Sequence, residues 1–194
     1  MSMKFLKNFA LATMIVALPT LASAGTANLA GGETKVYLSS GFVSALSSLG
    51  VTPGAVGPAS LYKGVATFPV TVGIADLTNT YVDLGHVGGL SLTAGSTKVT
   101  LVNFQIEALP GSHAYISGIV TVNGAIVGRI PLFDLAVGNV YQPNKESLSI
   151  QNVTVTLDAT AASALNSVFK VSAFAGGFGI GTASSLSFVE YSCY

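Results

Sequence analysis

Charged side chains are scarce in this 194-residue chain and make up only 8% of it. Ordinary globular proteins carry about 25%. Without Lys4 and Lys7, six basic residues stand against eight acidic ones, a formal charge of −2. The sequence has no basic stretch of the kind that binds nucleic acid or anionic membranes. Half of the residues are hydrophobic, which argues against disorder. We therefore expect a folded protein that does not bind nucleic acid.

Cysteine and catalytic motifs are lacking as well. Cys193 is the single cysteine, so it is either an incidental thiol or pairs with a second chain. The sequence contains no G-x-S-x-G, C-x-x-C, H-E-x-x-H or phosphate-loop pattern. Asp76 and Asp83 are the nearest approach to a carboxylate pair, and we interpret them as turn-forming residues. We predict that the protein is not an enzyme and carries no metal.

Long apolar runs are missing too, apart from a short one near the start of the chain. Lys4 and Lys7 precede an apolar stretch, residues 9–18, and Ala22-Ser23-Ala24 has the small residues that signal peptidase accepts. The stretch is too short to span a bilayer. We predict a signal peptide over residues 1–24 and a single exported domain over residues 25–194, located in the periplasm or outside the cell.

What the chain does have is alternation of apolar and polar residues. Segments 33–40, 66–73, 96–109, 114–124 and 148–159 each follow a period of two, as half-buried strands do. Asn123-Gly124 lies between two such runs and is a strong signal for a tight hairpin turn. The pattern predicts an all-β, mainly antiparallel fold, which we expect to be a β-sandwich.

Two segments have helical spacing instead. Residues 39–50 begin with serines that can cap a helix and end at Gly50, and residues 158–169 begin with Asp158. Both contain the tripeptide Ser-Ala-Leu, at 44–46 and 163–165, and both follow a strand-like run. We predict two short helices in a pseudo-symmetric repeat of strand, helix, loop and strand, with Leu46 and Leu165 as equivalent core residues.

The order of short motifs resembles a loose family of uncharacterised secreted bacterial β-domains. The motifs are FPVTVGIAD, HVGGLSL, VTLVNFQIE, the NG hairpin and PLFDL, and they extend over nearly the whole exported part. The same order is remotely similar to the HtaA-type haem-binding domain of bacterial haem-uptake proteins. That resemblance implies a haem site made by a tyrosine and a histidine. Ala45 falls at the expected tyrosine position, which leaves His86 with Tyr37 or Tyr81 as candidate haem ligands.

His86 has two interpretations. It lies in Gly-His-Val-Gly-Gly, where it is either a structural residue at a turn or a ligand of haem. The predicted function is accordingly that of a secreted, non-enzymatic cell-envelope or extracellular protein without a cofactor. It would act by binding cell-surface or matrix components, or by self-association. The alternative is haem binding and uptake.

Overall fold

The computed structural model describes residues 26–76, 81–136, 139–144 and 146–190. The predicted signal peptide and Cys193 lie outside these residues. The described part is mostly β-structure with two helices, as predicted. Its elements are β1 (Ala27–Leu38), α1 (Ser40–Ser48), β2 (Thr52–Val56), β3 (Ser60–Tyr62), β4 (Val65–Asp76), β5 (Tyr81–His86), β6 (Gly89–Ala94), β7 (Thr97–Ala108), β8 (Ala114–Val122), β9 (Ala125–Ala136), β10 (Asn139–Asn144), β11 (Ser147–Leu157), α2 (Ala159–Phe169) and β12 (Gly179–Glu190).

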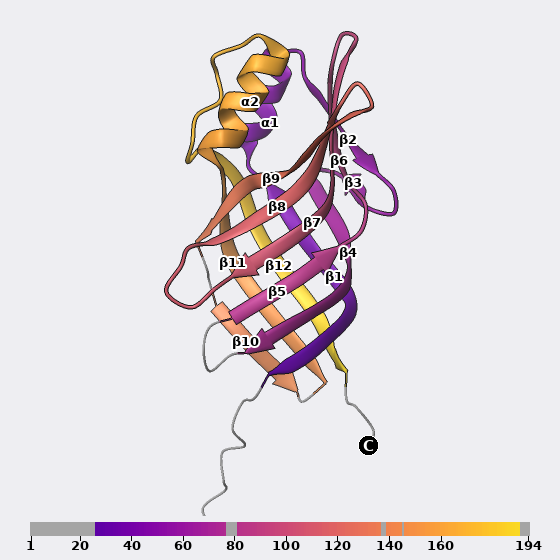
Figure 1. The fold of residues 1–194 in the computed structure, drawn as a ribbon, viewed down its shortest axis with the longest axis vertical. Coiled ribbons are helices and arrows are strands. Elements are labelled where there is room, and N and C mark those ends of the chain that lie inside the picture. Colours follow the sequence, from indigo (N-terminus) through magenta and orange to yellow (C-terminus); the bar gives the residue numbers. More distant parts are fainter. Residues whose placement is uncertain (1–25, 77–80, 137–138, 145, 191–194) are drawn as a thin grey trace, which may run out of the picture.

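Eight of the described strands close into an antiparallel barrel (Figure 1). The ring runs β7-β5-β4-β1-β12-β11-β9-β8 and returns to β7. Strand β7 closes it, because one edge pairs with β8 along most of its length while the other is shared between β6 and β5. The remaining strands β2, β3, β6 and β10 extend or flank this ring.

The expected sandwich is therefore wrong, and the fold is a barrel. Alternation predicts one buried face for each strand, which a sandwich and a barrel satisfy equally well. The closure depends on bends that alternation does not show. Asn103 in β7 and Asn152 in β11 have positive φ angles of 53° and 57°, and each lies at a shift of register with a neighbouring strand. Such bulges bend a strand and increase its twist.

Both helices begin where the sequence predicts. The Ser39 side chain accepts a hydrogen bond from the Phe42 N–H at 3.0 Å. At α2, one Asp158 carboxylate oxygen accepts from the N–H groups of Thr160 and Ala161 at 2.7 and 3.0 Å. Each cap satisfies backbone donors that the first helical turn leaves without partners.

The predicted repeat is limited to the strand and helix of each copy. Strand β12 pairs with β11, but the closing segment of the first copy, residues 55–61, is split between β2 and β3 and pairs with β6 and β4. The helices lie together at one end of the barrel (Figure 1). Leu46 is 1% exposed, whereas Leu165 is only partly buried, so the two leucines are not equivalent.

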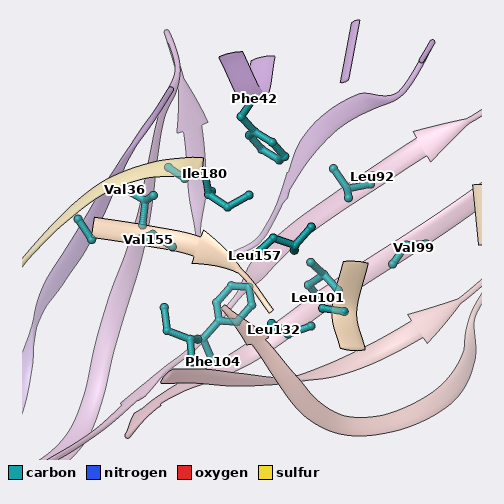
Figure 2. Close-up of a cluster of buried hydrophobic side chains, with 14 of the residues drawn as sticks. Val36, Phe42, Leu92, Val99, Leu101, Phe104, Leu132, Val155, Leu157 and Ile180 are labelled. Atoms are coloured by element: carbon teal, nitrogen blue, oxygen red, sulfur yellow. The ribbon is translucent and has the colours of Figure 1, made fainter. Parts of the chain in front are cut away.

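The core has two parts. The larger cluster fills the helical end of the barrel and includes Phe42, Leu101, Phe104 and Leu157 (Figure 2). The smaller cluster, which includes Leu29 and Leu84, fills the opposite end. Each draws its members from strands that are distant in the sequence, so burial of apolar area is coupled to barrel closure.

Candidate binding sites

His86 is the last residue of β5, and its ring lies inside the barrel with only 6% of the residue exposed. It is placed inward by the alternation of β5, in which Val82 and Leu84 are buried on the same side. The Nε2 atom is 2.7 Å from the Thr34 hydroxyl, which donates to the Ser185 hydroxyl at 2.9 Å. These residues form a polar belt that links β5, β1 and β12.

Burial determines the protonation of the ring. The Nε2 atom of His86 and the Thr34 hydroxyl are hydrogen-bond partners, and the tautomer of the ring decides which of them donates. Burial lowers the pKa of the imidazole from 6.5 to about 4, and the backbone of Phe104 and Leu84 opposes this only in part. His86 is therefore neutral at pH 7, and its Nδ1 atom has no hydrogen-bond partner in the described structure.

Tyr37 lies on the opposite surface of the barrel wall. On β1 the buried residues Thr34 and Val36 alternate with Lys35 and Tyr37, so Tyr37 faces outwards and is 48% exposed. It lines an outer groove of about 910 Å³ that crosses β1, β12 and β11. Other residues of this outer groove are Glu33, Lys35, Ser149, Gln151, Asn152, Thr182, Ser184 and Leu186.

The outer groove combines several kinds of contact. Lys35 Nζ lies 2.5 Å from Glu33 Oε1, and this partner raises the pKa of Lys35. Gln151 donates to the Ser149 hydroxyl at 3.1 Å. Leu186 adds an apolar surface that is 40% exposed. The groove therefore contains an ion pair, an amide and hydroxyl group and one apolar side chain.

The structure does not bring the three candidate ligands together. Tyr81 alternates with buried Val82 on β5 and so also faces outwards, on the other side of the wall from the His86 ring. Tyr37 pairs with Val65 at the start of β4, and Tyr81 pairs with Asp76 at its end. Eleven residues of strand separate these positions, on the order of 35 Å. Each candidate must therefore be judged in its own surroundings.

Sequence reasoning missed the outer groove because its residues come from both ends of the chain. The alternation of ETKVYLSS does place Glu33, Lys35 and Tyr37 on one face. Pairing of β1 with β12, and of β12 with β11, brings Gln151 and Asn152 near that face. No local pattern predicts these pairings. The buried Ser185 of the belt gave no signal either, because serine is common throughout the strands of this chain.

Within the described ranges, no three His, Cys, Asp or Glu residues gather closely enough to hold a metal ion. None of the described helices has the length and hydropathy needed to cross a membrane.

Comparison with solved structures identifies the class of fold. The C-terminal domain of HtaA from Corynebacterium glutamicum superposes with a TM-score of 0.67 at 14% identity, covering 84% of this chain and 99% of that domain. The N-terminal domain of HtaA gives a TM-score of 0.59 at 15% identity, covering 84% of this chain and 99% of that domain. The haem-binding protein HtaB of the same organism gives a TM-score of 0.52 at 11% identity, covering 86% of this chain and 98% of that protein.

The chain thus has the fold of HtaA-type domains, and the remote similarity predicted from its motifs is confirmed at that level. No model of a known family matches the sequence, and no curated protein matches it either.

Proposed function

We propose that this protein is an exported, non-enzymatic binding protein whose ligand is haem, held in the outer groove by Tyr37. The observation that carries the proposal is the exposed Tyr37 side chain in a groove of about 910 Å³. Pockets for small molecules and cofactors have volumes of roughly 300–1,000 Å³. The fold shared with HtaB, a haem-binding protein, supports the choice of ligand.

The residues of the outer groove fit this group. Tyrosine is an established axial ligand of haem iron, and Tyr37 would be that ligand here. Lys35 lies two residues from Tyr37 on the same face of β1, where its ammonium group could pair with a propionate if the ion pair with Glu33 opened. Leu186 offers apolar contact to the porphyrin.

The surroundings of His86 favour Tyr37 over His86 as the ligand. The His86 ring is enclosed, and its Nε2 atom is engaged by Thr34. The barrel cavity that it borders has a volume of about 140 Å³, below the range of cofactor pockets. In this proposal His86 supports the wall from inside, because Thr34 is on the same strand as Tyr37.

The test is a titration of the purified mature protein with hemin, followed through the Soret band. We expect a shift in the wild type that is lost in Tyr37→Phe and kept in Tyr81→Phe, the matched control on the far part of the wall. His86→Ala should keep the shift if the variant folds. No shift in the wild type would refute haem binding. Loss only in His86→Ala would keep haem as the ligand but refute the groove as its site.

Self-association is a second candidate function, favoured by an apolar strip on the outer surface. Val72 and Phe188 are 68% and 51% exposed, and both pair with Ala30, one on each side of β1. A variant of the C-terminal domain of HtaA forms a domain-swapped dimer, which shows that this fold can dimerise.

Sedimentation velocity over a concentration series tests the apolar strip. We expect a concentration-dependent dimer that Val72→Ser with Phe188→Ser abolishes. Ile126→Ser is the control, since Ile126 is 77% exposed in a different strand, β9. A monomer at all concentrations would contradict self-association.

A further inference from the structure

The interior of the barrel contains a second space, separate from the outer groove. Its volume is about 140 Å³, and nearly all of its surface is apolar. Val36, Leu92 and Phe104, which are labelled in Figure 2, are among the side chains that line it. Apart from Thr34 and His86 its lining is apolar, and apolar cavities of about this volume stay free of ordered water.

The residues that line the cavity are spread along the strands of the barrel. Its lining extends from Val99 to Ile106 on β7 and from Ile116 to Val122 on β8. Six or seven residues of strand correspond to about 20 Å. A volume of 140 Å³ spread over much of that length leaves a width suited to one unbranched chain and too small for a ring system such as haem.

The polar belt closes the deep end. Thr34 and His86 line the cavity, whereas none of the eight buried residues of the smaller core cluster does. Beyond the belt, Leu29 and Leu84 fill the barrel. His86 thus has a role that its turn-like sequence did not indicate, as part of the floor of an apolar cavity.

The other end reaches the surface beside the helices. Val127 lines the cavity and is 60% exposed, and Ala164 of α2 lines it as an exposed residue. Val127 follows the turn between β8 and β9, which lies at the helical end of the barrel (Figure 1). No Asp, Glu, Lys or Arg lines the cavity anywhere.

We propose that the barrel cavity binds the single alkyl chain of a monoacyl amphiphile. The chain would extend from the opening between Val127 and Ala164 toward the His86 floor, with its polar head in water. An eight-stranded barrel has an interior just wide enough to be filled by side chains or to hold one small ligand. Transfer of each methylene group from water into the cavity is the driving force.

The test uses unbranched 1-alkanols from six to twelve carbons, with binding to the mature protein measured by isothermal titration calorimetry. Affinity should rise about fourfold with each added methylene group. The rise should stop once the chain fills the cavity. A branched or cyclic alcohol of equal carbon number should bind at least tenfold more weakly. Equal affinity for linear and cyclic alcohols, or no increase with chain length, would overturn the proposal.

A pair of alanines in α2 provides matched variants. Ala161 and Ala162 are both buried, but only Ala161 lines the cavity. Ala161→Leu should fill the part of the cavity nearest its opening and reduce alkanol affinity more than tenfold. Its melting temperature should be unchanged or higher. Ala162→Leu should lower the melting temperature by overpacking while the folded protein still binds the alkanol. Unchanged binding in a folded Ala161→Leu protein would contradict the site.

The alkanol site is independent of the proposed haem site. Tyr37→Phe changes the outer surface and should leave alkanol affinity unchanged, so failure of either proposal can be recognised without the other.

Discussion

Acidification should destabilise the fold through His86. The buried ring titrates at about 4 because burial lowers its pKa, whereas an unfolded histidine titrates near 6.5. Between these values the unfolded chain binds a proton that the folded chain does not, so lowering the pH favours unfolding. The stability contribution is fully present above pH 6.5 and is lost as the pH falls toward 4. The difference between the two pKa values corresponds to about 3 kcal/mol of unfolding free energy. About 2.5 kcal/mol of it is lost between pH 7.5 and 4.5.

Urea unfolding of the mature protein and of His86→Gln between pH 7.5 and 4.5 measures this contribution. Glutamine does not titrate, so the wild type should lose about 2.5 kcal/mol more than the variant over that range. His113→Gln is the control, because the His113 side chain is 71% exposed and should leave the wild-type dependence intact. If the unfolding free energies of the wild type and of His86→Gln fell equally with pH, the reasoning would be refuted. An NMR titration of the His86 ring gives the folded pKa even if the variant does not fold.

Three further predictions concern stability and can be measured by denaturant melts. Leu46→Ala should cost about 2–5 kcal/mol because the side chain is fully buried, and Leu165→Ala should cost clearly less; equal costs would contradict the burial difference. Asp158→Ala should cost about 0.5–2 kcal/mol by removing the cap of α2, and no loss would show that the cap is dispensable. Gly89→Ala should lower the unfolding free energy by about 1–3 kcal/mol or more, since its Cβ would overlap the carbonyl of Leu101. Gly179→Ala, the control with no atom near its Cβ position, should change it by less than about 0.5 kcal/mol.

Local chemistry made the secondary structure predictable. Asn123-Gly124 forms the turn between β8 and β9 with positive φ angles of 50° and 85°, as its residue types require. Ser39 and Asp158 cap the two helices. In each case a few neighbouring residues determine the structure, so a short stretch of sequence is sufficient evidence.

The architecture and the sites depend on non-local pairing, which short stretches do not encode. Closure of the barrel requires β7 to pair with β8 while it also pairs with β5 and β6. The alternation of β5 turns His86 inward, but the position of β5 beside β4, with a register shift between Val70 and Gly73, depends on non-local pairing. From the sequence alone, the glycines around His86 indicate a loop. The structure instead places His86 at the end of a strand, and after Val87 and Gly88 the chain continues as β6 in the same direction along β7.

Strand β1 explains how one wall can serve two sites. Its inward residues Thr34 and Val36 border the apolar cavity. The residues that alternate with them, Lys35 and Tyr37, face outwards and border the outer groove. The sites are thus separated by the thickness of a single strand, and alternation assigns each residue to only one of them. A substitution at Tyr37 can change the groove without altering the cavity volume, because its side chain is outside. A substitution at Thr34 would free the Nε2 atom of His86 and alter the cavity floor while the groove side chains remain. The two proposed ligands therefore draw on the same strand but on different atoms of it, which is why each can be tested without disturbing the other.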